Sequence, residues 1–394
     1  MKKSGLSILT LGAAVLISAS LGQANAATVI KIASMSPLSG SSSDLGLQIR
    51  NATELAIKDN KAAFTALGFD VQFVAYDDQA DPTTGTANAR RIAADNSILA
   101  MVGTLNSGVV IPSSEVLAPS HVAIVSPANT NPKVTDRGLA NVNRICARDD
   151  SQGPAGADFL ISTVKAKRVY VLNDKTPYGQ GLADAAEAFM KTKGATVVAS
   201  EGTEEKSDFS SIITKIKASK ADAVYFGGLY GQVGPFAKQL REAGVTVPVM
   251  GGDGFDSPDL LSLAGAGAKD VFFTTVAPPL NAVPAARVLS ARYKAAYKKD
   301  LAGFGIMGYD SAKVVVAGVL SAIKANGNKL PTRTQVETAI RKTNLTGTLT
   351  GVIDFNSIGD RTSAKMYIIQ VKNDAAGKLD FSTAGTVTVK SSKQ

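Results

Sequence analysis

Short β-branched runs alternate with segments of helical periodicity along most of this chain, and this alternation constrains its fold more than any other feature. Residues 29–33 and 71–76 have the character of strands, and apolar side chains recur at helical spacing over residues 47–62 between them. Asp81 and Pro82 then open another helix, because Asp caps a helix and Pro fits its first position. Strand–helix–strand repetition of this kind predicts parallel sheets covered by helices on both faces.

The predicted strands fall into two series. The first series continues through residues 98–102, 122–125 and 141–145. The second series comprises residues 168–172, 196–199, 223–226, 247–250 and 271–275, with helical stretches such as 181–193 and 209–219 between them. Two series of about five strands in a chain of 394 residues predict two doubly wound, Rossmann-like α/β lobes rather than one closed barrel.

The C-terminal third departs from this alternation. Residues 284–299, 306–324 and 333–342 have the pattern of successive helices, and β character returns around 352–355 and 366–369. Helices and strands left over after two sheets are best explained if the chain returns to complete each lobe.

The N-terminus has the pattern of a secretory signal peptide over residues 1–26. Lys2 and Lys3 form its positive region, residues 6–21 are almost continuously apolar or small, and Ala24-Asn25-Ala26 is a small-x-small cleavage pattern. A membrane anchor is the alternative, but a spanning helix needs about 20 apolar residues, and no Cys stands at the cleavage point to carry a lipid. We therefore expect cleavage after Ala26 and an exported protein that works in the periplasm.

The charge of the chain has two possible meanings. A formal net charge of +9, from 42 Lys and Arg against 33 Asp and Glu, would by itself suggest a nucleic-acid partner. The basic residues are scattered, often beside acidic ones, and no dense basic run is interleaved with aromatic side chains. A basic, well-solvated surface explains the charge, and we expect no nucleic-acid partner.

The chain is poor in residues that carry catalytic chemistry. It contains one His, His121, and one Cys, Cys146, so an internal disulfide and a Cys/His zinc cluster are excluded. A His-based triad, a nucleophile elbow and a phosphate-binding loop are all missing from the strand–helix context that such motifs need. We expect no metal, no cofactor and no enzymatic activity.

Glycine and small polar residues gather where the predicted strands end. Each such segment alone is compatible with an ordinary turn. Ligands of open α/β sheets, however, bind beyond the carboxyl ends of the strands, near helix N-termini. Six segments on the same side of two sheets therefore predict a ligand cleft between the lobes. The segments are residues 36–40, 103–108, 126–130, 173–179, 227–230 and 251–255.

Several short stretches resemble a known family, in the same order along the chain from about residue 29 to 370. The family is that of the periplasmic substrate-binding proteins of bacterial ABC importers, of the type that binds leucine, isoleucine and valine. No single stretch is diagnostic, but their order and spacing are specific. The stretches are Ser36-Pro37-Leu38-Ser39-Gly40, Tyr76-Asp77-Asp78, Asp81-Pro82, Ser126-Pro127-Ala128, Asp150-Ser151-Gln152-Gly153-Pro154, Tyr178-Gly179-Gln180-Gly181, Lys206-Ser207-Asp208-Phe209 and Gly251-Gly252-Asp253-Gly254.

The resemblance implies a type I periplasmic-binding-protein fold, in which two α/β lobes joined by three chain crossings close over a ligand like a Venus flytrap. On this basis lobe 1 comprises residues 27–147 and about 278–357, and lobe 2 comprises residues 148–277 and about 358–394. The partners implied are a small-molecule ligand and an inner-membrane ABC permease, and we expect a monomer.

The resemblance also implies roles for individual residues. Ser107 matches the loop that holds the ligand carboxylate together with main-chain N–H groups. Ala128 would offer its carbonyl to the ligand ammonium group, and Thr130 its hydroxyl and backbone. Tyr178 matches a tyrosine that covers the ligand from the second lobe, and Asp253 an acidic residue that pairs with the ammonium. A zwitterion that leaves water needs donors at one end and a carboxylate at the other, which agrees with this set.

Three departures from the family pattern concern the ligand and the rigidity of the site. Leu45 stands where branched-chain amino-acid binders often have an aromatic side chain. Leu229 follows the paired glycines in place of an aromatic residue, so that Tyr230 comes one position late. Neither Ala80 nor Asn106 is a Cys, although the amino-acid binders often bridge those positions.

We therefore expect a solute-binding protein that captures a branched-chain or similar apolar amino acid by hinge closure. Relatives in the family also bind aromatic acids, amides and urea, so such a ligand is the alternative within the same function. A sensory ligand-binding module of the same fold is the second alternative, and an enzyme is the third.

Overall fold

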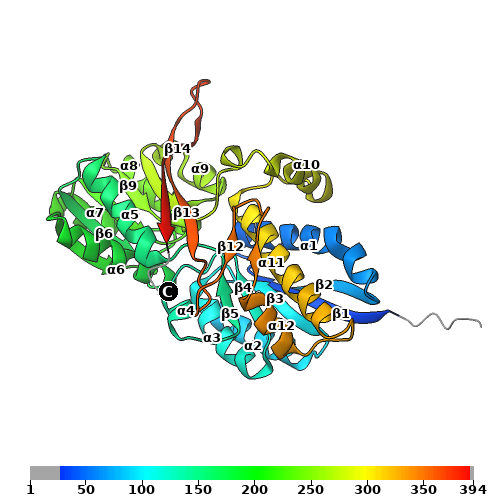
Figure 1. Ribbon diagram of the computed structural model, residues 1–394. Helices are drawn as coiled ribbons and strands as arrows, with labels where there is room; N and C mark the ends of the chain where they lie inside the picture. The colour runs from blue at the N-terminus through cyan, green and yellow to red at the C-terminus, as the bar shows by residue number, and fades with distance from the viewer. Residues whose placement is uncertain (1–26, 391–394) are drawn as a thin grey trace, which may run out of the picture.

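Two α/β lobes lie side by side in the computed structural model, which describes residues 27–390 (Figure 1). Lobe 1 is built on a five-stranded parallel sheet with strand order β2-β1-β3-β4-β5. Every residue of β3 and β4 is buried, because helices cover both faces of this sheet. The strands are β1 (Thr28–Ser36), β2 (Phe69–Asp77), β3 (Ile98–Gly103), β4 (Ala123–Ser126) and β5 (Val142–Arg144).

The helices of lobe 1 come from two distant parts of the chain. The N-terminal part supplies α1 (Ser43–Thr65), α2 (Pro82–Ala94), α3 (Ser107–Leu117) and α4 (Lys133–Asp136). The C-terminal part supplies α10 (Ala286–Tyr297), α11 (Gly303–Ala325) and α12 (Arg333–Arg341). Helices α1 and α11 pack together on one face of the sheet, and α2 and α3 pack together on the other. The chain thus returns to lobe 1 after it has built the parallel strands of lobe 2.

Lobe 2 is built on a seven-stranded sheet with strand order β14-β13-β10-β9-β8-β6-β7. Five strands are parallel to one another: β6 (Arg168–Asn173), β7 (Thr196–Gly202), β8 (Ala223–Gly227), β9 (Val249–Gly251) and β10 (Val271–Thr275). The antiparallel pair β13 (Ser363–Asn373) and β14 (Leu379–Lys390) extends the sheet beyond β10. The helices of lobe 2 are α5 (Asp149–Ser162), α6 (Pro177–Thr192), α7 (Ser210–Ser219), α8 (Tyr230–Glu242) and α9 (Asp259–Ala264).

Three chain segments cross between the lobes, between β5 and α5, between β10 and α10, and before β13. A buried ion pair ties the third crossing to the first. Arg144 Nε donates to Asp360 Oδ1 at 2.6 Å, and Arg148 Nη1 donates to Asp360 Oδ2 at 2.9 Å. Burial alone would raise the pKa of Asp360, but the two arginines and Thr135 outweigh it and hold that pKa below its usual value.

The predicted elements are present, and some of them differ in extent. Helix α6 begins at Pro177 rather than at residue 181, because the Thr176 side chain caps it and Pro fits its first position. The β character expected around residues 366–369 belongs to the β13–β14 hairpin, which stands out from the body of the molecule (Figure 1). Residues 352–355 contribute only the short strand β12 (Ile353–Asp354), paired with β11 (Asn344–Leu345).

One helix of the described chain, α11, is long and apolar enough to cross a membrane. Most of its apolar stretch is buried inside lobe 1 against α1, which is the pattern of a core helix. The predicted signal peptide, residues 1–26, lies outside the described residues.

Candidate functional site

A cavity lies between the lobes, at the carboxyl ends of their strands. Residues of both lobes line it, and its free volume is only about 10 Å³, roughly the room that one water molecule needs. Small-molecule sites usually have about 300–1,000 Å³, so in this closed arrangement the lining side chains fill most of the space between the lobes. The lining residues are Leu45, Leu105, Asn106, Ala128, Tyr178, Leu229, Asp253, Gly254 and Phe304.

Buried Asn129 ties together the two loops that carry much of the lobe 1 wall. Its Oδ1 accepts from the Thr104 amide at 3.0 Å and from Ser126 Oγ at 2.6 Å. Its Nδ2 donates to the Leu105 carbonyl at 2.9 Å. The loops after β3 and β4 are thereby fixed to each other, so Leu105 and Ala128 keep their places in the wall.

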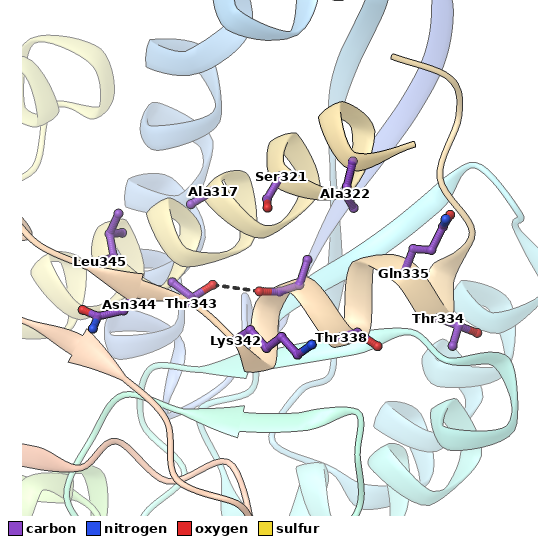
Figure 2. Close-up of a pocket in the computed structure, with 12 residues that line it drawn as sticks. Ala317, Ser321, Ala322, Thr334, Gln335, Thr338, Lys342, Thr343, Asn344 and Leu345 are labelled. Atoms are coloured by element: carbon purple, nitrogen blue, oxygen red, sulfur yellow. Dashed lines mark hydrogen bonds between the residues drawn. The ribbon is translucent and has the colours of Figure 1, made fainter. Parts of the chain in front are cut away.

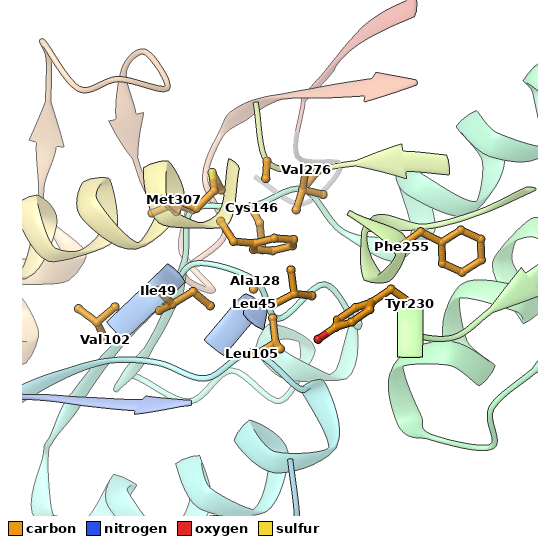
Figure 3. Packing of buried hydrophobic residues seen from close by; sticks show 14 of the residues in the cluster. Leu45, Ile49, Val102, Leu105, Ala128, Cys146, Tyr230, Phe255, Val276 and Met307 are labelled. Atoms are coloured by element: carbon orange, nitrogen blue, oxygen red, sulfur yellow. The ribbon is translucent and has the colours of Figure 1, made fainter. Parts of the chain in front are cut away.

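The lobe 1 wall is mainly apolar. Leu45, in the first turn of α1, lies beside Leu105 and Ala128, and Tyr230 of lobe 2 reaches towards them (Figure 3). Phe304, at the start of α11, completes this part of the wall. An apolar portion of a ligand would be buried here at a gain of about 25 cal/mol per Å².

The lobe 2 wall is polar and centres on Asp253, which follows β9. Tyr178 Oη donates to Asp253 Oδ1 at 2.9 Å and accepts from the Gly254 amide at 2.9 Å. Gln152 Nε2 donates to the same carboxylate oxygen at 2.8 Å. Asp253 is only 4% exposed, and its burial raises its pKa to about 6 despite these two hydrogen bonds.

A second buried carboxyl group, that of Asp149, adjoins Asp253 through Gln152. Gln152 Nε2 donates to Asp149 Oδ1 at 3.1 Å as well as to Asp253. Burial, and then the charge of Asp253, raise the pKa of Asp149 to about 8. Asp149 Oδ2 has no hydrogen bond of good geometry within residues 27–390. Two adjoining buried carboxyls favour the binding of a cation.

Six of the nine predicted site residues line the cavity: Leu45, Asn106, Ala128, Tyr178, Leu229 and Asp253. The other three lie within two residues of a lining residue in the sequence but are not part of the wall. Ser107 Oγ accepts from the Asn131 amide at 3.3 Å, Thr130 Oγ1 is buried without a hydrogen bond of good geometry in the described chain, and Tyr230 is 4% exposed. Contact with a ligand remains a prediction for all nine.

Sequence reasoning does not single out five residues of this region. Leu105 and Gly254 stand inside the polar strand-end segments, where side-chain direction cannot be deduced from spacing. Phe304 opens a helix of the C-terminal third, and no local pattern shows that this helix returns to the cleft. Asp149 and Gln152 begin the helix after the first crossing, and the available signal was the pair of adjacent acids Asp149-Asp150 in its first turn.

A larger surface groove, with a volume of about 550 Å³, lies between α11 and α12 (Figure 2). Small and polar side chains of the two helices line it, and of the described residues in its wall only Lys342 is charged. It is not at the carboxyl end of either sheet, and none of the predicted site residues reaches it. Charge, burial and position therefore favour the smaller cavity between the lobes as the functional site.

Comparison with known sequences gives a consistent result. The model of the periplasmic binding protein family matches residues 29–378. An amino acid binding protein from Pseudomonas aeruginosa is 37% identical over 262 residues, which cover 66% of this chain and 70% of that protein. The Leu/Ile/Val-binding protein BraC3 from Rhizobium johnstonii is 32% identical over 351 residues, which cover 89% of this chain and 93% of that protein.

Solved structures share the fold. The leucine binding protein LivK from Thermotoga maritima superposes with a TM-score of 0.79 at 28% identity, covering 92% of this chain and 99% of that one. A solute binding protein from R. palustris in complex with benzoate also gives a TM-score of 0.79, at 20% identity over 92% of this chain and 98% of that one, a likeness of fold alone. The chain belongs to the periplasmic binding protein family.

Proposed function

We propose that this protein is the periplasmic solute-binding component of an ABC importer, and that it captures an apolar amino acid between its lobes. The observation that carries this proposal is buried Asp253, which lines a cavity built from both lobes beside an apolar wall and is joined through Gln152 to the buried carboxyl group of Asp149. An ammonium group and an apolar side chain are the two features of a ligand that such a site complements.

An acidic side chain would hold the ammonium end of the ligand, and hydrogen-bond donors would hold its carboxylate end. The ammonium group would pair with Asp253, with Ala128 offering its carbonyl. The carboxylate would lie at the start of α3, where Asn106 lines the cavity and the first turn supplies main-chain N–H groups with the positive end of the helix dipole. Ser107, just behind the wall, would turn its hydroxyl towards the same carboxylate. No Lys or Arg is among the described residues that line the cavity, so the carboxylate depends on these neutral donors.

The ligand side chain would lie against Leu45, Leu105 and Phe304. These side chains are 1%, 7% and 1% exposed, so the surface that they offer is already shielded from bulk water. Three apolar groups in one wall favour an aliphatic side chain such as that of leucine, isoleucine or valine.

An amide or urea-like compound is the second candidate ligand, because its neutral N–H groups also pair with a buried carboxylate. An aromatic acid without an amine is disfavoured, since its carboxylate would be brought towards two buried acids with no cation in the wall to balance it.

Uptake would follow from a shift between open and closed lobes. A ligand that contacts both walls binds the closed form more tightly and therefore moves the equilibrium towards it. The closed form would then dock on the inner-membrane permease. We propose that the protein works in the periplasm after loss of residues 1–26 and that it releases its ligand chemically unchanged.

Native mass spectrometry of gently purified protein, followed by calorimetry with L-leucine, L-isoleucine, L-valine, benzoate, acetamide and urea, tests the proposal. We expect a bound amino acid and heat of binding with at least one of the three aliphatic amino acids. Binding of benzoate alone, or conversion of any bound compound, would contradict it. In cells, deletion of the gene should reduce uptake of the same amino acid.

A further inference from the structure

Two side-chain hydrogen bonds join the lobes outside the cavity and away from the three crossings. Asn131 Nδ2 of lobe 1 donates to the Pro177 carbonyl of lobe 2 at 2.6 Å. Ser257 Oγ of lobe 2 donates to Asp44 Oδ2 of lobe 1 at 2.8 Å. None of these four residues lines the cavity, yet each is close in sequence to one that does. The two bonds therefore depend on closure without depending on a ligand.

Asn131 is held in place before it reaches across to lobe 2. Its Oδ1 accepts from the Lys133 amide at 2.8 Å, and its main-chain carbonyl accepts from Arg144 Nη1 at 2.9 Å. Its side chain is 5% exposed. Because lobe 1 already orients this amide, the bond to the Pro177 carbonyl forms with little further loss of side-chain freedom.

Glycine allows the lobes to come this close. A Cβ atom at Gly181, inside α6, would lie 2.5 Å from Asn131 Nδ2. A Cβ atom at Gly108 would lie 3.1 Å from Pro177 Cδ, and one at Gly231 would lie 3.3 Å from the Ser41 carbonyl oxygen. Gly181 is the tightest of these contacts, and Gly in a helix interior is unfavourable relative to Ala. Its presence in α6 is explained by the approach of Asn131.

The second contact is also specific to the closed arrangement. Ser257 is fully buried and stands two residues after Phe255, at the end of the turn that carries Asp253. Its partner Asp44 is half-buried in the first turn of α1, next to Leu45 of the cavity wall. Opening the lobes would return both groups to water.

We propose that the Asn131–Pro177 and Ser257–Asp44 hydrogen bonds are two latches that hold the lobes closed. Gly181 is required for the first latch. From outside the cavity, the two latches set the affinity for ligand and the rate at which ligand is released. The effect on ligand rests on the proposed function. The effect on closure does not, because both bonds lie between protein groups.

Two substitutions disrupt one latch each, and each has a matched control nearby in the chain. Gly181→Ala places a methyl group against the Asn131 amide, and Gln180→Ala changes the exposed neighbour on α6. Ser257→Ala removes the donor to Asp44, and Ser262→Ala removes an exposed hydroxyl of α9 that bonds only within that helix. Asn131→Asp removes the donor of the first latch itself, while it keeps the oxygen that accepts from Lys133.

Closure is measured without ligand as the distance between two spin labels, one on each lobe, by electron spin resonance. The labels are attached to cysteines introduced at two exposed positions, Ala63→Cys in α1 and Lys238→Cys in α8. The one natural cysteine, Cys146, is buried, so it does not compete for label. Affinity and release rate are measured with L-leucine by calorimetry and stopped-flow. Thermal unfolding of the unliganded protein reports the stability of each variant.

We expect Gly181→Ala, Asn131→Asp and Ser257→Ala each to reduce the fraction of molecules with closed lobes, which have the short distance between labels. Each variant should also bind leucine about three- to tenfold more weakly, mainly because it releases leucine faster. The two controls should match the wild type. Gly181→Ala should also unfold at the same or a higher temperature than the wild type, since Ala favours α6, and a general loss of structure would have the opposite effect. If all three variants gave the same distance distribution as the wild type, the proposal that these hydrogen bonds hold the lobes closed would be wrong. Failure of the wild type to bind any amino acid would instead count against the proposed function. The distances between the labels would still test whether the two hydrogen bonds hold the lobes closed.

Discussion

The Tyr178 hydroxyl donates to Asp253 Oδ1 at 2.9 Å and at the same time accepts from the Gly254 amide. One side chain from the start of α6 thus orients both the carboxylate and the turn that carries it. The same hydroxyl group lies in the wall of the cavity, so the tyrosine has a structural and a ligand-facing role together.

Tyr178→Phe removes this hydroxyl and leaves the buried Gly254 amide without its partner. We expect ligand affinity to fall by about 1–3 kcal/mol, the usual effect of one unpaired buried donor. The ring remains in the cavity wall, so small-angle scattering should still detect compaction on addition of ligand. Tyr178→Ala should reduce this compaction. Equal compaction in Tyr178→Ala and wild type would contradict the role of the ring in closure.

Asp253→Asn keeps the shape and the acceptor of the side chain but removes its charge. If the ligand ammonium is buried against this carboxylate, binding should weaken by about 2–5 kcal/mol in calorimetry. Asp184→Asn, an exposed change on α6, is the control and should have no effect. Unchanged affinity of Asp253→Asn would remove this residue from the site.

Affinity for an amine-bearing ligand should depend on pH in one direction. The pKa of Asp253 is about 6 without ligand, and an ammonium group beside the carboxylate lowers it, so binding below pH 6 must displace a proton. Affinity should therefore be constant from about pH 7 upwards, as far as Asp253 is concerned, and fall by up to about tenfold per pH unit below 6. Calorimetry at pH 4.5–7.5 checks this, and the fall attributable to Asp253 should be absent in Asp253→Asn.

Asp149→Asn should stabilise the unliganded protein and weaken its binding of ligand. The pKa of Asp149 is about 8 in the fold and about 3.9 in the unfolded chain, so folding takes up a proton between these values and stability falls as pH rises through this range. Asn has no such proton to lose and still accepts from Gln152. The gain in the free energy of unfolding should be larger at pH 8 than at pH 5, by roughly 1–4 kcal/mol. Chemical denaturation at both values tests this, and an equal gain at both would show that Asp149 is charged in the fold.

Asp360→Ala should destabilise the protein because it leaves two arginines buried without their shared carboxylate. Arg144 is fully buried and Arg148 is 6% exposed, so neither recovers its hydration in the variant. We expect a loss of about 3–5 kcal/mol of unfolding free energy. Asp158→Ala, which removes an exposed acid of α5, should change stability by less than about 0.5 kcal/mol.

Much of the fold follows from local pattern. The β-branched runs become buried strands in parallel order, and the polar and glycine-rich segments lie at their carboxyl ends, as periodicity and turn chemistry predict. Asp253 and Tyr178 stand in such segments, and the resemblance to the binding-protein family is what singles them out among their neighbours. The start of α6 was misjudged by four residues, although Thr176 and Pro177 carry a cap signal.

Other parts of the site have no local signal. Phe304 faces the cavity because α11 packs on α1, and the contact between these two helices joins residues far apart in the chain. Ser107 and Thr130 stand in the predicted loops but are not in the wall, because side-chain direction in a loop follows from backbone angles that spacing does not reveal.

The sequence by itself determined the two series of strands, the edge of the sheets at which polar residues collect, and the scarcity of catalytic side chains, because these depend on burial periodicity and composition within a few residues. The tertiary structure alone decided that Gln152 joins Asp149 to Asp253 and that Asn131 meets Pro177 across the cleft. These contacts depend on how two separately built lobes pack against each other. The pKa values and the hydrogen bonds between the lobes depend on that packing in turn.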